Sequence, residues 1–269
     1  MSLSNPTLRQ LGIFVAGTDT EVGKTRISTG LLHAFAERGW RTAGYKPVAA
    51  GQDRLADGRW VNEDVEALRC AGSLPLTDRE VGPWQWRSAC APHIAARLDA
   101  EAAEAAGQPV RRFDPALCLA GARRLQARAD LLVVEGVGGF VVPLTDGAAP
   151  DLPWWGSDDL ALGLGLPVVL VVGMRLGNIS HALLTAEAVH ARGLRLLGWV
   201  ANTVDAGMGW RSENLQTLRA LLMQRYGAVC LGDVPRLADP TPAAVAAGLD
   251  ADLLMNLLAR PLGVEENPA

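Results

Sequence analysis

The sequence predicts an α/β fold, an open and mostly parallel sheet with helices on both faces. Short apolar runs alternate along the chain with segments whose apolar residues recur at helical spacing. Several apolar runs are continuous stretches of Val, Leu and Ile, as expected for parallel strands that are covered on both faces. A glycine-bounded loop also separates the first apolar run from the first helical segment.

The expected elements follow in chain order. Strands are predicted at Leu11–Ala16, Thr42–Val48, Leu131–Glu135, Val168–Val172, Leu197–Asn202 and Val229–Val234. Helices are predicted at Thr25–Arg38, Val61–Ala71, Pro92–Ala106, Pro115–Ala129, Ser180–Arg192, Arg211–Tyr226 and Ala243–Leu258. Two patches rich in Pro, Gly and Trp, Gly82–Trp86 and Thr145–Gly156, predict irregular loops. We expect one domain over residues 1–269, with flexible ends at 1–10 and about 262–269.

Composition excludes several classes of protein. With 49% hydrophobic and 20% charged residues, the 269-residue chain is neither disordered nor fibrous. The net charge of −4, without a basic stripe, argues against a nucleic-acid partner. The longest apolar run, Leu166–Val172, is far shorter than the roughly 18 residues of a membrane helix. Four scattered cysteines and the lack of a signal-like N-terminus favour a cytoplasmic protein without zinc or disulfides.

Residues Gly17–Thr25 have the features of a phosphate-binding loop. The segment follows a predicted strand, opens a predicted helix and ends in Gly-Lys-Thr. Backbone N–H groups would face the phosphates, Lys24 would reach the β- and γ-phosphates, and Thr25 would ligate magnesium. Five residues separate the glycines instead of the usual four. We nevertheless predict a nucleotide site in a P-loop NTPase-type fold.

Lysine is rare in this chain. Lys24 and Lys46 are the two lysines among 25 basic residues, a bias that GC-rich codons would explain. A compact ammonium suits a tight polyanion site better than a wide guanidinium does. Lys46 lies near the end of the second predicted strand, on the edge of the sheet that carries the loop. It is either a second cation for the transferred phosphoryl group or a lysine extending from a strand end.

Two carboxylates are candidate magnesium ligands. Glu135 ends a buried-looking apolar run before a glycine-rich turn, and the carboxyl ends of parallel strands meet the ligand crevice. Asp64 lies at a helix start, where an acidic residue also suits the helix dipole. The pattern alone therefore leaves Asp64 open between these two roles.

With these motifs, the chain resembles the dethiobiotin synthetase family over roughly residues 11–240. The resemblance is carried by Gly17–Thr25, whose unusual spacing is the family's own form, by Gly44–Val48 and by Val134–Gly139. Arg175–Ile179 and Gly198–Asn202 add support.

The resemblance implies ATP-dependent ring closure of 7,8-diaminononanoate with CO₂ through a carbamate and a carbamic–phosphoric anhydride. It implies a homodimer and Mg²⁺ held by Thr25, Asp64 and Glu135, with Lys24 and Lys46 as catalytic residues. The implied nucleotide site comprises Glu21, Val22, Gly23, Lys24, Thr25, Arg26, Asp64, Glu135, Gly136, Val137, Gly138, Asn202, Thr203, Pro235, Arg236 and Leu237. The implied substrate contacts are Thr20, Lys46, Ala50, Gly177, Asn178, Ile179 and Ser180. The last four form a helix start that receives the substrate carboxylate across the dimer interface.

Three positions depart from the family pattern, and two other functions are compatible with a phosphate loop. Ala50 stands where Ser or Thr is usual, Arg175 where Lys is common and Ser180 where Asn is common. A cobyrinic-acid-type synthase would need a glutaminase domain, for which the chain has no motif. A partition-type ATPase switch would carry a lysine early in the loop, where this chain has Thr18 and Asp19.

Overall fold

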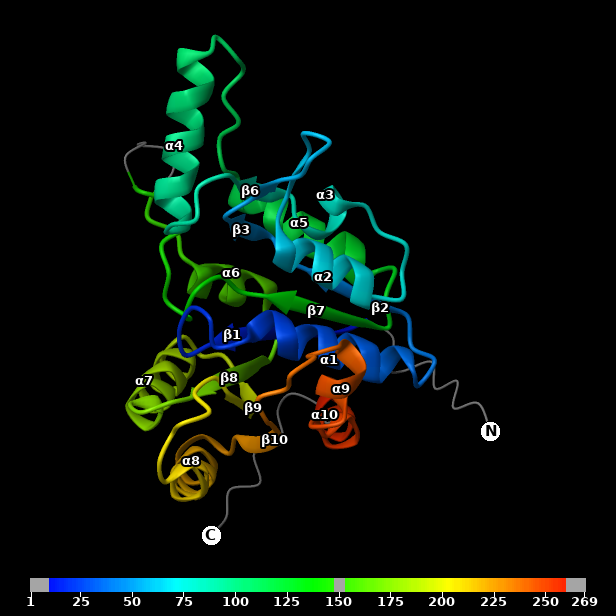
Figure 1. Ribbon diagram of the computed structural model, residues 1–269, viewed down its shortest axis with the longest axis vertical. Helices are drawn as coiled ribbons and strands as arrows, with labels where there is room; N and C mark the ends of the chain where they lie inside the picture. The colour runs from blue at the N-terminus through cyan, green and yellow to red at the C-terminus, as the bar shows by residue number, and fades with distance from the viewer. Residues whose placement is uncertain (1–9, 148–152, 260–269) are drawn as a thin grey trace.

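The computed structural model describes residues 10–147 and 153–259, and a six-stranded sheet lies at its centre (Figure 1). All neighbouring strands in this sheet are parallel. In spatial order the strands are β10 (Val229–Val234), β9 (Leu196–Thr203), β8 (Val168–Met174), β1 (Leu11–Gly17), β7 (Leu131–Glu135) and β2 (Thr42–Tyr45). The expected fold class, an open parallel α/β sheet, is confirmed.

Ten helices are assigned within the described residues. They are α1 (Lys24–Ala36), α2 (Glu63–Ala71), α3 (Asp78–Val81), α4 (Pro92–Ala105), α5 (Pro115–Gln126), α6 (Ser157–Leu164), α7 (Asn178–Ala191), α8 (Arg211–Tyr226), α9 (Pro242–Ala246) and α10 (Ala251–Leu258).

The direction in which the chain crosses the sheet decides which face each helix covers. The β1–α1–β2 connection runs toward one edge, whereas β7, β8, β9 and β10 follow one another toward the other edge. Because crossovers between parallel strands are right-handed, helices on connections of opposite direction lie on opposite faces. Accordingly α1 lies on one face, while α5, which packs with α6, and α7, which packs with α8, lie on the other (Figure 1). Helix α2, from the excursion between β2 and β7, and helices α9 and α10, after the last strand, pack beside α1. The reversal of direction leaves a crevice at the carboxyl end of β1.

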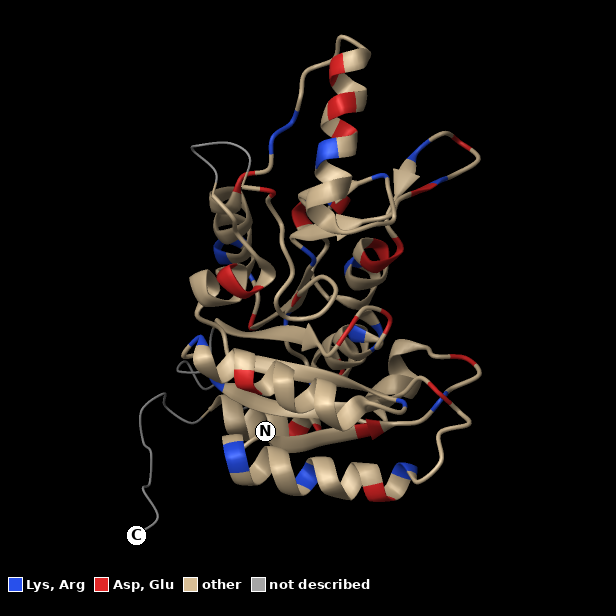
Figure 2. Ribbon diagram, turned by 90° about the vertical axis from the view of Figure 1, so that its left-hand side faces the viewer, with Lys and Arg blue, Asp and Glu red and all other residues tan. Residues whose placement is uncertain are grey.

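A smaller substructure lies between β2 and α5. It contains the parallel pair β3 (Val48–Ala50) and β6 (Trp84–Trp86), and the hairpin of β4 (Asp53–Arg54) and β5 (Trp60–Val61). The rings of Trp84, Trp86 and Phe113 pack together next to this pair. From here α4 projects away from the main sheet, with the acidic residues Asp99, Glu101 and Glu104 and one basic residue, Arg97, along it (Figure 2).

The structure differs from the sequence-based expectations at three predicted elements and contains others that were not predicted. The expected strand Thr42–Val48 is divided into β2 and β3 at Pro47, which has no N–H for a ladder. The expected loop Gly82–Trp86 is wrong for its last three residues, which pair with β3 as β6. The expected helix Ala243–Leu258 is divided into α9 and α10, because Gly248 turns the chain and Asp250 caps a new helix. Helices α3 and α6 were not predicted.

The main sheet is deeply buried. Every residue of β2, β7, β8 and β9 is buried, which explains the continuous apolar runs in the sequence. No helix within residues 10–147 and 153–259 is long and apolar enough to cross a membrane. The expected flexible ends lie outside the described residues, apart from Gln10, as do residues 148–152 of the expected loop Thr145–Gly156.

Candidate functional site

The loop between β1 and α1 has a backbone suited to binding phosphate. Glu21 and Gly23 adopt positive φ angles of 59° and 90°. At Gly23 the close approach of another side chain also excludes a larger residue, since a Cβ there would lie 2.2 Å from Nδ2 of Asn202. Lys24, the first residue of α1, directs its Nζ back over the loop to the carbonyl of Asp19 at 3.0 Å. The loop, the helix N-terminus and the Lys24 ammonium therefore surround a space for anionic oxygens.

Four side chains meet beside this loop, from the start of α1, the residue after β2, the start of α2 and the end of β7. The hydroxyl of Thr25 lies 2.6 Å from Oδ1 of Asp64 and 2.8 Å from Oε1 of Glu135, and donates to one of them at a time. The ammonium of Lys46 lies 2.6 Å from Oε1 of Glu135 and 3.0 Å from Oδ2 of Asp64. Its third N–H faces the carbonyl of Gly136 at 3.1 Å, so all three of its donors have acceptors.

Burial strengthens the attraction between the charged groups of this cluster. Lys46 is 2% exposed and the Glu135 side chain is fully buried. Burial alone would lower the pKa of Lys46, but attraction by Glu135 and Asp64 outweighs it and raises the pKa above its ordinary value. Burial would likewise raise the pKa of Asp64, but Lys46 and the hydrogen bond from Thr25 lower it. At neutral pH this cluster therefore holds the Lys46 ammonium beside the ionised Asp64 carboxylate.

Lys24 differs from Lys46 in its charge balance. Burial, followed by repulsion from Lys46, lowers the pKa of Lys24 to about 8. The carboxylates compensate it only in part, because its Nζ bonds a neutral carbonyl instead of an acidic group. The positive charge of the Lys24 ammonium is thus only partly neutralised by neighbouring carboxylates, as expected for a group that binds phosphate oxygens.

The second half of the expected nucleotide site lies at the ends of β9 and β10. Asn202 and Val234 are register partners, which brings Asn202 next to the segment Pro235–Leu237. The Asn202 amide donates from Nδ2 to the carbonyl of Val22 at 2.8 Å, and its buried Oδ1 has no partner within the described residues. This oxygen can accept a hydrogen bond from a ligand amine.

Two other residues expected at the nucleotide, Thr203 and Arg236, form hydrogen bonds within the protein. The Thr203 hydroxyl accepts from Nε of Arg211, and Arg211 is also paired with Asp233. Arg236 donates to the carbonyl of Val204 at 3.0 Å. Both residues therefore brace the chain around Asn202. Arg26 lies in the first turn of α1, directly after Thr25.

The glycine-rich turn after β7 lies against the phosphate loop. Gly136 supplies a carbonyl to Lys46, and Val137 continues the turn. Gly138 has a φ of 64°, and a Cβ there would lie 3.6 Å from the hydroxyl oxygen of Thr20. Thr20, expected as a substrate contact, is therefore close to this turn.

The expected carboxylate-binding segment is at the start of α7. Gly177 is the N-cap, with a φ of 94°, and Asn178 is buried with an unpartnered Oδ1. Arg175, just before it, forms an ion pair with Asp19 of the phosphate loop. Within the described part of the chain, no hydrogen bond joins Gly177–Ser180 to Lys46 or Ala50.

Two contributors to the site were missed by the sequence reasoning. Arg175 forms an ion pair with Asp19. In the sequence Arg175 was noted only as a departure from the family pattern, and nothing there indicated this pairing. Asn62 caps α2 and also donates a hydrogen bond to the carbonyl of Gly51, directly after β3. In the sequence, only its position two residues before Asp64 could have indicated a role at the site.

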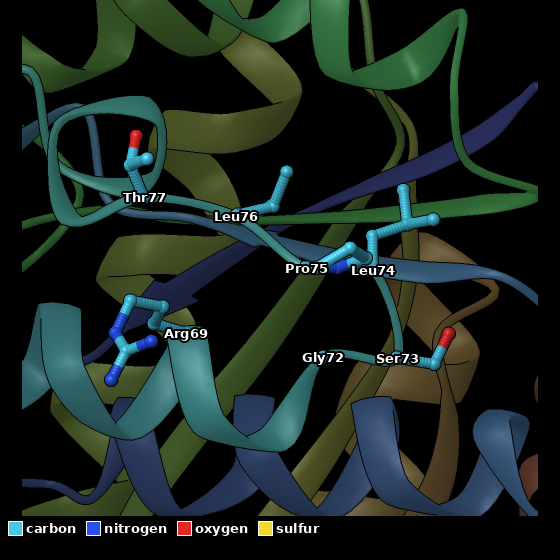
Figure 3. Close-up of a pocket in the computed structure, with 7 residues that line it drawn as sticks. All are labelled: Arg69, Gly72, Ser73, Leu74, Pro75, Leu76 and Thr77. Atoms are coloured by element: carbon cyan, nitrogen blue, oxygen red, sulfur yellow. The ribbon is translucent and has the colours of Figure 1, made fainter.

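A separate depression lies at the far end of α2. It has a volume of about 440 Å³ and is lined by Arg69 and the α2–α3 connection from Gly72 to Thr77 (Figure 3). The Arg69 guanidinium is already paired with Glu66. Because Asp64 lies at the opposite end of the helix, this depression is not part of the site.

Comparison with known proteins agrees with this arrangement. Residues 11–244 match a family described as an AAA domain. An ATP-dependent dethiobiotin synthetase of Janthinobacterium sp. (strain Marseille) is 47% identical over 246 residues, which cover 90% of this chain and 95% of that protein. The chain belongs to the dethiobiotin synthetase family. In this member of the dethiobiotin synthetase family, Ala50, expected as a substrate contact, is the last residue of β3.

Two solved structures that match the chain have low sequence identity to it. The MinD cell division protein of Aquifex aeolicus is 12% identical with a TM-score of 0.48, covering 95% of this chain and 100% of its own. A chain of the MinC:MinD cell division complex of the same organism is 11% identical with a TM-score of 0.46, covering 95% and 99%.

Proposed function

We propose that the chain is an ATP-dependent dethiobiotin synthetase that closes 7,8-diaminononanoate with CO₂ to form the cyclic urea of dethiobiotin. The observation that carries this proposal is the meeting of Lys24, Lys46, Asp64 and Glu135 beside a phosphate-type loop, in a chain 47% identical to such an enzyme. The reaction needs ATP phosphates, an anionic carbamate and an amine side by side. Two buried lysines, one with a lowered pKa and one with a raised pKa, can bind these anionic groups.

Bonds form and break at the two substrate amines, at the carbamate and at the γ-phosphate of ATP. One substrate amine adds to CO₂ and loses a proton, which gives a carbamate. A carbamate oxygen then attacks the γ-phosphorus of ATP, and the bond from phosphorus to the ADP oxygen breaks. The second amine attacks the carbonyl carbon of the resulting anhydride, phosphate leaves, and the five-membered urea closes with loss of a proton.

Lys46 serves this sequence as a fixed positive charge. Its raised pKa keeps it an ammonium, so it does not take the proton from the amine. Its charge can instead stabilise the carbamate and the transferred phosphoryl group. Lys24 holds the β- and γ-phosphates, and the loop N–H groups orient them for in-line transfer.

Thr25, Asp64 and Glu135 have the donor chemistry of a magnesium site. Their hydroxyl and carboxylate oxygens are the hard ligands that Mg²⁺ prefers. Buried Oε2 of Glu135 has no hydrogen-bond partner within the described residues, so it is available for a cation. When bound, Mg²⁺ would neutralise charge on the β- and γ-phosphate oxygens. The three residues then need only keep their oxygens directed toward the phosphate loop.

A homodimer would complete the substrate site. Leu176 and Leu184 are 91% and 68% exposed, and they flank the expected carboxylate-binding residues at the start of α7. Ser180 and Leu184 are one helical turn apart, so they share an exposed face. Large exposed apolar side chains beside a helix N-terminus support a second copy that docks there and brings its substrate carboxylate to that N-terminus.

An ADP-release assay tests the proposed activity. We expect turnover only when 7,8-diaminononanoate, bicarbonate, Mg²⁺ and ATP are all present. ATP hydrolysis at the same rate without the diamine would contradict the proposal and favour a nucleotide switch.

Hybrid dimers test the shared site. We expect mixing inactive Lys24→Ala subunits with inactive Asn178→Ala/Ser180→Ala subunits to restore part of the activity. Hybrids that form but stay inactive would show that the carboxylate is not bound across the interface.

A further inference from the structure

The side chain of Asn62 joins two segments that flank the reacting groups. Its Oδ1 accepts from the N–H of Val65 at 3.1 Å and so caps α2. Its Nδ2 donates to the carbonyl of Gly51 at 2.6 Å. Asn62 is 6% exposed, so water has little access to either bond. One carboxamide thus ties the start of α2 to the end of β3.

Gly51 directly follows β3, the strand that leads away from Lys46. The N–H of Gly51 donates to the carbonyl of Trp86 at 3.0 Å, while its own carbonyl receives Asn62. The backbone N–H of Lys46 at the other end donates to the carbonyl of Val81 at 2.8 Å. The segment from Lys46 to Gly51 is therefore held at both ends, and Asn62 provides one of the ties.

Asp64 depends on this tie because its own side chain is poorly packed. The side chain is 42% exposed, yet Oδ1 faces Thr25 at 2.6 Å and Oδ2 faces Lys46 at 3.0 Å. Asp64 is the second residue of α2, so its position follows from where α2 begins. The Asn62 cap defines that starting point, and the bond from Nδ2 to the Gly51 carbonyl holds it against the end of β3, so the placement of Asp64 depends on both bonds.

The hairpin of β4 and β5 explains why such a tie is needed. Residues 52–61 leave the body of the molecule at Gly51 and return at Asn62, forming a projecting loop in Figure 1. Residues 53–60 of this hairpin are all exposed. Apart from the pairing of Asp53 with Val61 and the Arg87 guanidinium over the Trp60 ring, the hairpin has little packing, and the buried Asn62–Gly51 bond closes its base.

We propose that Asn62 is a positioning residue that sets the Asp64 carboxylate against Lys46 and Thr25 by holding the Gly51 carbonyl. The consequence for the reaction rests on the proposed function, in which Asp64 contributes to the magnesium site. The cap and the tie are separable, because Oδ1 makes one and Nδ2 makes the other.

Asn62→Ser separates the two roles. Serine keeps an oxygen that caps α2 but has no amide to donate to Gly51. Asp250→Ser is the matched control, since Asp250 caps α10 through the N–H of Leu253 at 2.8 Å, away from the site. In the unliganded protein we expect Asn62→Ser to speed amide hydrogen exchange at residues 48–52 at least about fivefold, as loss of one buried hydrogen bond implies. The rate of amide hydrogen exchange in α2 should be the same as in the unsubstituted protein.

The functional readouts are magnesium dependence and turnover. For Asn62→Ser we expect the Mg²⁺ concentration that half-saturates the thermal stabilisation by ADP to rise at least about fivefold, with kcat reduced. Stabilisation by ADP without Mg²⁺ should be unchanged, and Asp250→Ser should match the parent throughout. Asn62→Asp, which keeps the cap but turns an acceptor toward the Gly51 carbonyl, should have at least as large an effect.

Two results would overturn the proposal. One is parental exchange at residues 48–52 together with parental Mg²⁺ dependence in Asn62→Ser. The other is an equal loss of ADP stabilisation with and without Mg²⁺, which would mark general damage. If the parent chain did not turn over the diamine, the proposed function would fail, but the exchange and ADP measurements would still decide the role of Asn62.

Discussion

Nucleotide affinity should fall as the pH rises through about 8, because Lys24 loses its proton there in the unliganded protein. Burial and repulsion from Lys46 lower the pKa of Lys24 to about 8. Phosphate oxygens around the ammonium favour its charged form, so the complex holds this proton more tightly than the free protein does. Since the bound state carries more protons, affinity decreases with increasing pH.

The size of the effect follows from the pKa. With a free-state pKa of about 8, Lys24 is about half protonated at pH 8 and about one tenth protonated at pH 9. If binding returns the pKa to its ordinary value of 10.5 or above, the dissociation constant for ADP rises about tenfold between pH 7 and pH 9, or about 1.4 kcal/mol. Binding at pH 8 should take up about half a proton.

Isothermal titration calorimetry measures both quantities. ADP is titrated at pH 7, 8 and 9 in two buffers of different ionisation enthalpy, which gives the affinity and the number of protons taken up. Lys24→Arg is the matched control, because a guanidinium keeps its proton throughout this range. Ionisation of ADP itself affects both proteins equally. Equal affinity of the parent at pH 7 and pH 9, or the same tenfold loss in Lys24→Arg, would refute the reasoning.

Three further predictions concern the surroundings of the second lysine. Lys46→Arg should lower turnover at least about tenfold, or about 1.4 kcal/mol of barrier, because a planar guanidinium cannot place three N–H groups on the same three oxygens; near-parental kcat and KM in steady-state kinetics would contradict this. Lys46→Gln should also destabilise the fold by about 3–5 kcal/mol in urea unfolding, because it leaves buried Glu135 unpaired, and adding Glu135→Gln should recover much of the loss. Tyr45→Phe removes the 2.9 Å bond to the buried carbonyl of Cys118 and should lower the unfolding free energy by about 1 kcal/mol while leaving kcat parental; a parental stability or an altered kcat would count against it.

Much of the architecture could be predicted because it depends on local chemistry. Continuous apolar runs such as those of β7 and β8 indicate strands buried on both faces, and Gly17–Thr25 indicates a loop at a helix start. The errors occurred where a local signal competed with pairing at a distance. Trp84–Trp86 looked like a loop because of its neighbouring Gly and Pro, but β3 provided a partner for a strand.

The sequence by itself determined the strand–helix alternation, the phosphate loop and the two lysines. These are properties of residue type and spacing along the chain, which do not depend on distant contacts. Only the tertiary structure decided that Asp64, whose pattern allowed either a helix-dipole or a ligand role, meets Thr25 and Lys46. Residues 25, 64 and 135 belong to α1, α2 and β7, and residue 46 directly follows β2; the order of strands across the sheet brings these segments together. That order, and the small tie made by Asn62, depend on which surfaces pack against each other, a property that no single segment of the chain carries.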